Sequence, residues 1–420
     1  MAKNRIYMCF DLKSFYASVE CVERGLDPFK VNLIVADPSR GDRTICLAAS
    51  PAIKALGVKS RCRVYEIPKG IEYIMAPPRM QLYINYSVKI YGIYLKYAAK
   101  EDIHIYSIDE IFMDATDYIG ARGLTQREFA RAVMKDIFDA TGITATCGIG
   151  SNLYLAKIAL DIISKHSPEY IGELTEESYR DKLWDHTPLR DFWRIGTGTA
   201  GRLARMGIRT MREIALADES LLYKTFGVDA QLMIDHAWGR ESASIADIKA
   251  YAPQSSSIST GQVLHEGHGI KAARLLILEM AELLSLDLVR DGMAAGSVNI
   301  SLGYSFSASV PPAHGSINLD SPTSSTKKLL EYTAALYDRT AVRDEYVYRL
   351  TVCFAKLEPE LGRQYDMFSD AEAQDKEKRL QKTVIEIKRK YGKNGIFKGM
   401  NLLEGATTLE RNRQIGGHRA

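Results

Sequence analysis

Apolar and polar positions alternate with two periods along the chain, and each period predicts a different kind of element. In the first half, short β-prone runs predict a strand at 5–11, a strand pair around 103–113 and a strand at 143–149. Apolar spacings of three and four predict helices over 83–100 and 126–140. The resulting order of strands and helices resembles a βαββαβ unit.

The second half repeats this order after a helical stretch at 185–241 and a polar, proline-containing linker at 241–254. Its predicted helices cover 271–289 and 324–337. Its predicted strands are 257–264, 297–304, 316–319 and 346–354. The pattern therefore predicts an α+β protein with several domains, as a length of 420 residues also indicates.

Composition narrows the class of protein without fixing the function. A hydrophobic content of 46% with 25% charged residues is typical of a soluble globular protein. A net charge of +3 does not by itself indicate a nucleic-acid-binding protein. The six cysteines form no CxxC pair, which favours reduced thiols over a zinc site. Asp11 and Lys13 interrupt the first apolar run, so we expect no signal peptide, no membrane span and a cytoplasmic location.

Carboxylates stand at the ends of two predicted strands that are far apart in sequence. Asp11 ends the first strand, and Asp109 and Glu110 lie between the two strands of the pair. Crowded carboxylates are costly without a cation, and an all-oxygen ligand set favours a hard ion such as Mg²⁺. Taken alone, Asp109 and Glu110 favour an ordinary hairpin turn with solvated acids. Together with Asp11 they could hold two metal ions.

Residues 11–20, followed by residues 107–110, resemble the Y-family (translesion) DNA polymerases of the DinB/UmuC branch, and most closely the UmuC-like proteins of Gram-positive bacteria. The resemblance implies a right-hand polymerase with a ferredoxin-like palm, small fingers, a helical helix-hairpin-helix thumb and a βαββαβ little finger. The implied boundaries are palm 1–13 and 80–172, fingers 14–79, thumb 173–240, linker 241–254, little finger 255–358 and C-terminal tail 359–420.

The same resemblance implies the roles of the active-site residues. Asp109 and Glu110 would be catalytic and, with Asp11 and the backbone carbonyl of Leu12, would bind two Mg²⁺ ions. Tyr16 would be the steric gate that excludes ribonucleotides. The implied nucleotide-binding residues are Phe15, Tyr16, Ser50, Lys54 and Lys165.

Three positions depart from the family pattern. Pro51 stands where a tyrosine would bind the triphosphate, and Lys54 stands where an arginine would. Lys54 is a point charge without the bidentate fork of arginine. Lys165 lies one residue later after Asp161 than the commoner spacing, and we interpret Lys157 as a structural or DNA-facing residue.

Further contacts follow from the resemblance outside the palm and fingers. Gly196 and Gly198 precede a helix in the thumb and would bind a DNA phosphate. In the little finger the candidate phosphate ligands are Lys271, Arg274, Lys327 and Lys328, for which ordinary solvated helix faces are a strong alternative. The motif Gln364, Met367 and Phe368 resembles a sliding-clamp-binding peptide, or else docks on its own domain. Residues 405–420 are polar and glycine-rich, and we expect them to be mobile.

These observations favour a template-directed DNA polymerase of the translesion type, of low fidelity, acting in DNA repair or the SOS response. Its expected partners are primer-template DNA, dNTPs, a sliding clamp and a UmuD-like or recombinase accessory protein, and we expect a monomer. A non-catalytic DNA-damage or clamp-binding accessory protein is the first alternative, but it has no need of three adjoining acids. A nucleotidyl cyclase is the second alternative, but a cyclase does not need thumb-like and little-finger-like domains that bind duplex DNA.

Overall fold

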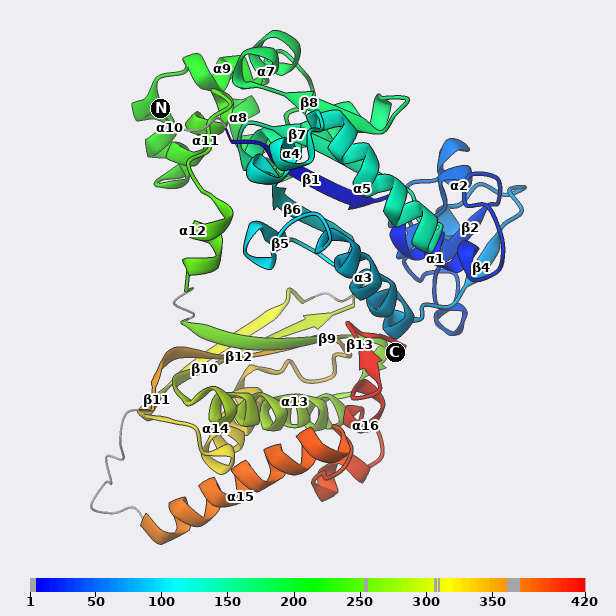
Figure 1. Ribbon diagram of the computed structural model, residues 1–420. Coiled ribbons are helices and arrows are strands. Elements are labelled where there is room, and N and C mark those ends of the chain that lie inside the picture. Colours follow the sequence, from blue (N-terminus) through cyan, green and yellow to red (C-terminus); the bar gives the residue numbers. More distant parts are fainter. Residues whose placement is uncertain (1–4, 253–255, 306–307, 309, 361–370, 420) are drawn as a thin grey trace. The chain divides into compact units, whose positions relative to one another are not determined.

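The computed structural model describes residues 5–252, 256–305, 308, 310–360 and 371–419. By the contacts between Cα atoms, the chain divides into two compact units, Met1–Ala252 and Pro253–Arg419. Each unit is described by itself below (Figure 1). Within the described ranges, we find no helix with the length and apolar character needed to cross a membrane.

The first unit is built on a five-stranded sheet with β1 (Tyr7–Leu12) at its centre. β1 pairs antiparallel with both β6 (Glu110–Asp114) and β7 (Ala145–Gly150). The outer strands are β5 (Ile103–Ile105) and β8 (Ile171–Leu174). Because β1 is covered on both faces, its run from Tyr7 to Phe10 is fully buried, as the continuous apolar pattern predicts.

Side chains of β1 alternate between two helical layers. Phe10 packs on Tyr94 of α3, with ring centroids 5.5 Å apart, whereas Cys9 packs on Ala156 of α6 on the other face. Gly148 and Gly150 of β7 let α6 approach closely, because an added Cβ would lie 2.1 Å and 2.2 Å from the backbone of Ala156. The helices of this part are α3 (Met80–Tyr94), α4 (Thr116–Arg122), α5 (Gln126–Thr141), α6 (Leu153–Ile158), the π-helix η4 (Ala159–Ile163) and the 3₁₀ helices η3 (Lys100–Asp102) and η5 (Ser164–His166).

The segment between β1 and α3 forms a smaller sheet with the strand order β3-β2-β4. This part of the chain has its own apolar core. Its elements are α1 (Phe15–Val22), β2 (Leu33–Val35), η1 (Pro38–Arg40), β3 (Ala48–Ala49), α2 (Pro51–Ala55), η2 (Val64–Glu66) and β4 (Ile74–Ala76). α2 is short and begins with Pro51, which fits the first turn of a helix because it lacks an N–H.

The rest of the first unit is helical. Its elements are α7 (Glu176–Leu183), η6 (Leu189–Asp191), α8 (Thr197–Arg205), α9 (Met211–Leu216), α10 (Glu219–Phe226), α11 (Asp229–Ala237) and α12 (Ile245–Ala250). α12 lies inside the stretch that the sequence predicts to be a linker. Ser244 and Asp247 form a capping box there, and Ile245 is buried beside β1 and β6, so this stretch is ordered on the large sheet.

The second unit is a four-stranded antiparallel sheet with the order β11-β10-β12-β9 and two helices on one face. The strands are β9 (Ser257–His268), β10 (Met293–Tyr304), β11 (Ala313–Thr323) and β12 (Val347–Pro359). The helices α13 (Ile270–Asp291) and α14 (Thr326–Thr340) enclose the core with the inward residues of the strands. The predicted βαββαβ order is therefore present, with longer strands than predicted.

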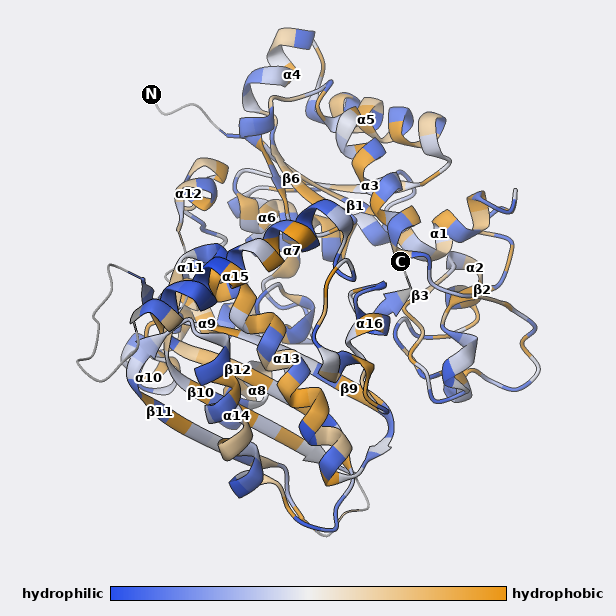
Figure 2. Cartoon of the chain, turned by 90° about the horizontal axis from the view of Figure 1, so that it is seen from below, coloured by the Kyte–Doolittle hydropathy of each residue, from blue (hydrophilic) through white to orange (hydrophobic). Residues whose placement is uncertain are grey.

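The segment after β12 packs on α13, so the expectation of a mobile end at 405–420 is wrong for residues 405–419. The segment contains the largely hydrophilic helix α15 (Ala371–Tyr391; Figure 2), η7 (Gly399–Leu402), α16 (Thr408–Arg411) and the hairpin of β13 (Gln414–Ile415) and β14 (His418–Arg419). The carboxylate of Glu279 on α13, which is 0% exposed, accepts hydrogen bonds from Asn401 Nδ2 at 2.7 Å and Thr407 N at 2.8 Å. A tertiary partner on a distant helix thus orders a sequence that is locally polar.

We expect Glu279→Ala to release this segment, because it leaves the buried Asn401 amide and the partly buried Thr407 N–H without an acceptor, at a cost of about 1–3 kcal/mol for a buried donor. Limited proteolysis should then cut residues 393–419 faster than in the wild type. The control is Glu331→Ala on the exposed face of α14. Equal cleavage rates for Glu279→Ala and the wild type would contradict the anchoring role.

Candidate active site

The antiparallel pairing of β1 and β6 brings the three predicted acids together. Asp11 lies opposite Glu110 in the register, and Leu12 N donates to the carbonyl of Asp109 at 2.9 Å. Ser107 Oγ donates to Asp109 Oδ1 at 2.6 Å and fixes that side chain in the turn before β6. Residues nearly one hundred positions apart therefore share one end of the sheet.

Burial and the two neighbouring carboxylates, Asp109 and Glu110, raise the pKa of Asp11 from 3.8 to about 7. The ammonium groups of Lys165 and Lys157 oppose this shift only in part. Like charges that crowd in a partly desolvated site favour the protonated form. A cation bound between these acids would remove the repulsion, so the electrostatics of the site fit a metal ion.

Glu110 has a partner that the sequence analysis missed. Lys157 Nζ lies 2.8 Å from the Glu110 carboxylate, and the Lys157 side chain is only 8% exposed. Cys9 Sγ donates to Glu110 Oε1 at 3.2 Å. Lys157 also pairs with Asp161 at 3.1 Å, so a residue interpreted as structural or DNA-facing belongs to the candidate active site. Its four-residue spacing to Asp161 was the available signal.

The acids do not form a ready metal cage in this arrangement. Across the described ranges, no group of three or more His, Cys, Asp or Glu side chains is gathered tightly enough to hold a metal ion. Glu110 is instead paired with Lys157, whose Nζ lies 2.8 Å from its carboxylate. The donor chemistry nevertheless fits, because Asp11, Asp109, Glu110 and the Leu12 carbonyl offer only oxygen ligands.

Tyr16 lies at the start of α1, near these acids. Its ring stacks on Tyr83 of α3, with centroids 4.4 Å apart and an interplanar angle of 14°. Tyr16 is partly exposed. The Phe15 side chain, in contrast, is only 2% exposed, which leaves its backbone as the group that could reach a nucleotide.

The predicted nucleotide-binding residues of α2 have different local roles. Ser50 is fully buried, accepts from Leu33 N at 3.0 Å and donates to Val31 O at 2.7 Å, so its hydroxyl is used within the fold. Lys54 Nζ donates to Ser14 Oγ at 2.7 Å beside the first turn of α1. Burial lowers the pKa of Lys54, while the nearby Asp11 opposes the shift. Of Ser50 and Lys54, only Lys54 has a side chain that could reorient from its present hydrogen bond toward a ligand.

The unusual spacing of Lys165 coincides with a π-helical turn. Residues Ala159–Ile163 form η4, and such a turn accommodates one extra residue inside a helix. Lys165 Nζ lies 3.2 Å from Asp161 Oδ1, and its charge acts on Asp11. The wider turn therefore keeps Lys165 within electrostatic reach of the acids despite the longer spacing.

Gly196 and Gly198 lie at the N-terminal end of α8, as the predicted phosphate contact requires. Both are exposed, and no heavy atom lies within 4 Å of a Cβ built on either of them. Helix N-termini with unpaired N–H groups are suited to phosphates. Arg202 on α8 lies over the Phe226 ring, 4.6 Å from its centroid.

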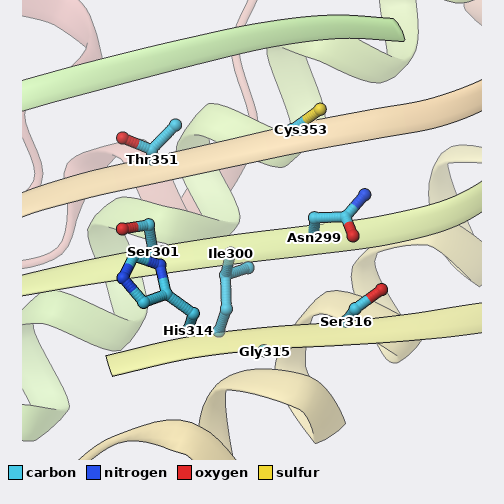
Figure 3. Close-up of a pocket in the computed structure, with 8 residues that line it drawn as sticks. All are labelled: Asn299, Ile300, Ser301, His314, Gly315, Ser316, Thr351 and Cys353. Carbon is cyan, nitrogen blue, oxygen red and sulfur yellow. The ribbon is translucent and has the colours of Figure 1, made fainter. Parts of the chain in front are cut away.

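The second unit offers a sheet face that the sequence analysis did not single out. A hollow of about 370 Å³ lies across β10, β11 and β12, opposite the helices (Figure 3). Its polar side chains are small and uncharged or weakly basic: Asn299, Ser301, His314, Ser316, Thr351 and Cys353. The predicted basic residues are instead on α13 and α14, where Arg274 forms two hydrogen bonds with Asp338. The clamp-like residues Gln364, Met367 and Phe368 lie outside the described residues.

Comparisons with known proteins decide the family. The model of the impB/mucB/samB family matches residues 10–161, and its C-terminal domain model matches residues 255–367. The chain is 30% identical over 431 residues to DNA polymerase IV 2 of Bacillus subtilis, and the alignment covers 100% of both chains. The chain belongs to the Y-family DNA polymerases.

Two further comparisons agree with this assignment. A Bacillus subtilis protein named for UV-damage repair, UvrX, is 29% identical over 418 residues, covering 98% of this chain and 97% of that protein. A solved Y-family DNA polymerase chimera superposes with a TM-score of 0.63 at 20% identity, covering 84% of this chain and 99% of the chimera. The expected α+β, multidomain polymerase fold is confirmed. Membership of this family implies the use of a divalent metal ion.

We expect Asp11→Asn to stabilise the metal-free protein at pH 8 and to have little effect at pH 4. The pKa of Asp11 is about 7 in the folded chain against 3.8 ordinarily, so the folded state holds the proton more tightly. That stabilisation is complete below pH 4 and is lost as the pH rises through 7, where Asp11 must ionise beside the other acids.

Calorimetry in EDTA at both pH values measures this difference, with the exposed Asp181→Asn as the control. A lower unfolding temperature for Asp11→Asn than for the wild type at pH 8 would show that the crowding argument is wrong.

We expect Lys157→Met to destabilise the metal-free protein by about 3 kcal/mol, because it leaves the buried Glu110 charge without its partner. Added Mg²⁺ should then raise the unfolding temperature of the variant more than that of the wild type. Thermal unfolding with EDTA and across a Mg²⁺ series checks both expectations. Lys135→Met, on an exposed pair with Asp139, is the matched control; an equal Mg²⁺ response in Lys157→Met and the wild type would refute the pairing role.

Proposed function

We propose that this chain is a template-directed DNA polymerase of the translesion type, which adds dNTPs to a primer 3′-hydroxyl. The observation that carries the proposal is the crowding of Asp11, Asp109 and Glu110 at one sheet end, which raises the pKa of Asp11 to about 7. Family membership supports the reaction class, and the named relatives DNA polymerase IV 2 and UvrX support DNA synthesis in damage repair.

The metal we propose is Mg²⁺, in two copies. Asp11, Asp109, Glu110 and the Leu12 carbonyl would hold it, and Glu110 would exchange Lys157 for the ion. When bound, the two ions supply the positive charge that activates the primer hydroxyl and stabilises the leaving pyrophosphate. Asp161 already contacts Lys157 at 3.1 Å and can keep its ammonium neutralised after that exchange.

The chain's own residues then bind and orient the nucleotide. Lys54 and Lys165 lie within electrostatic reach of Asp11 and would bind the triphosphate. The Tyr16 ring, fixed by its stacking on Tyr83, would fill the space of a ribose 2′-hydroxyl and so exclude ribonucleotides. A rigid ring is required for this role, because a mobile side chain would move aside and admit the 2′-hydroxyl.

Duplex binding would be independent of sequence. The open N-terminus of α8 at Gly196 and Gly198 would bind one backbone phosphate. The hydroxyl, amide and imidazole groups of the sheet face in the second unit offer many neutral contacts to a sugar-phosphate backbone (Figure 3). Such contacts hold a duplex without reading its bases, as a polymerase that moves along DNA requires. We propose low-fidelity synthesis with lesion bypass in the SOS response.

We further propose a sliding clamp as partner, through Gln364, Met367 and Phe368, and a monomer that works with a UmuD-like or recombinase accessory protein. The clamp motif is supported by its sequence pattern, with an aliphatic-aromatic pair as the apolar anchor. These partners are separate from the chemistry and can be tested without it.

Primer extension with Mg²⁺ and dNTPs tests the main proposal, on an intact template and on one with an abasic site. We expect extension by the wild type and a loss of at least about 10³-fold in the Asp109→Ala, Glu110→Ala double variant, because both metal ligands are gone. The control is Glu177→Ala on the exposed first turn of α7. DNA binding by gel shift should persist in every variant.

If the wild type binds primer-template but extends neither template, the non-catalytic accessory protein becomes the better assignment. Bypass of the abasic site by the wild type, together with an inactive double variant, establishes both the site and the translesion class.

A further inference from the structure

Lys13 is an ammonium group at the active-site end of β1 that the resemblance assigns no role. Its backbone is fixed from both sides, because Lys13 N donates to Thr144 O at 2.9 Å and Ser18 Oγ donates to Lys13 O at 2.7 Å. Its Nζ lies 4.0 Å from the centroid of the Tyr170 ring and 5.8 Å from that of Phe29. Cation–π contact with two rings holds the charge in place without neutralising it.

Tyr170 is itself held in an unusual backbone conformation. Its φ is 56°, in the left-handed region that bulky residues rarely adopt. The conformation is maintained by two backbone hydrogen bonds, from Cys147 N to Tyr170 O at 2.9 Å and from Tyr170 N to Ser167 O at 3.0 Å. The fold therefore places an aromatic ring under the Lys13 ammonium at some conformational cost.

Three lysines converge beside the acids. Lys54 Nζ is bonded to Ser14 Oγ, one residue from Lys13, and Lys165 follows the π-helical turn that leads to Tyr170. The charges of Lys165 and Lys54 act on that of Lys13, so the three ammonium groups repel one another. Within the part of the chain that the structure describes, Lys13 has no ion-pair partner, and the carboxylate that acts on it is Asp11.

We propose that Lys13 binds the triphosphate of the incoming nucleotide and forms, with Lys54 and Lys165, a three-lysine cradle for a polyphosphate. This inference rests on the proposed polymerase function and deepens it. A polyphosphate carries several negative charges along a chain of tetrahedra, so it can relieve the repulsion of all three ammonium groups at once.

The cradle also accounts for Pro51. That position carries no hydroxyl, and Lys54 has no bidentate fork, so this chain lacks two of the contacts that the resemblance leads one to expect. Lys13 supplies a third point charge next to the Leu12 carbonyl, on the same strand end as Asp11. In this proposal Lys13 at the end of β1 adds to the phosphate contact that Lys54 makes from α2.

The test is nucleotide binding without chemistry. The full chain is assembled on a primer-template whose primer ends in a dideoxynucleotide, and the Kd of the matching dNTP is measured with Mg²⁺ for the wild type, Lys13→Met and Lys13→Arg. We expect Lys13→Met to raise this Kd about 10- to 100-fold, as the loss of one charged hydrogen bond implies, and Lys13→Arg to restore most of the affinity. The Kd for primer-template alone should not change.

Two further measurements separate binding from a structural role. In primer extension, Lys13→Met should raise the KM for dNTP and leave kcat within about threefold of the wild type. Inorganic tripolyphosphate should inhibit the wild type in competition with dNTP, with a Ki that rises in Lys13→Met in parallel with the dNTP Kd. Tyr170→Leu, which keeps Lys13 but removes the ring beneath it, should raise the dNTP Kd as well, and Lys135→Met should not.

The outcomes distinguish this inference from the polymerase proposal. If the wild type binds dNTP and extends primers while Lys13→Met retains the wild-type Kd, the role of Lys13 is overturned and the polymerase assignment stands. If Lys13→Met does not fold, the same comparison is made with Lys13→Gln and Tyr170→Leu, and unchanged Kd values in both overturn the role. A wild type that neither binds dNTP nor extends primers refutes the polymerase proposal itself.

Discussion

The electrostatic repulsion among Asp11, Asp109 and Glu110 is the constraint on which the rest of the first unit depends. It arises from one structural choice, the antiparallel register that places Asp11 opposite Glu110. A fold that needed only stability would not bring three carboxylates to one end of a buried strand, because their proximity raises the pKa of Asp11 and disfavours ionisation. The packing of β1 between two helical layers is what holds them there.

Cations arranged around the acids offset this repulsion. Lys157 neutralises Glu110 directly and is itself shared with Asp161, which in turn contacts Lys165. Basic and acidic side chains thus alternate from Lys157 on α6, through Asp161 in the π-helical turn at Ala159–Ile163, to Lys165. Among the described residues neither Lys13 nor Lys54 forms an ion pair, so in our proposal these two ammonium groups attract a polyanion. In our proposal, metal binding and triphosphate binding are therefore two parts of one charge balance.

Several features were readable from the sequence because they depend on local pattern. The apolar run ending at Asp11 predicted a strand, and the apolar spacing over 126–140 predicted a helix that the structure extends by one residue at its end. Residues 405–419 were misjudged, because their order comes from the buried acceptor Glu279 on α13, more than one hundred positions away. α12 was missed for the same reason, since it is a short helix whose burial depends on the strands it covers.

The sequence by itself determined the family, and it singled out Asp11, Asp109, Glu110 and Tyr16 as candidate site residues, because these lie in short motifs. Only the tertiary structure decided which cations serve those acids. Lys157 contacts Glu110, and Lys13 lies on the Tyr170 ring, through pairings between elements far apart in sequence. The structure also showed that the buried Ser50 hydroxyl forms its hydrogen bonds within the fold. Charge interactions act through space and are weak signals along a chain, so their partners become visible only when the fold brings them within a few ångströms.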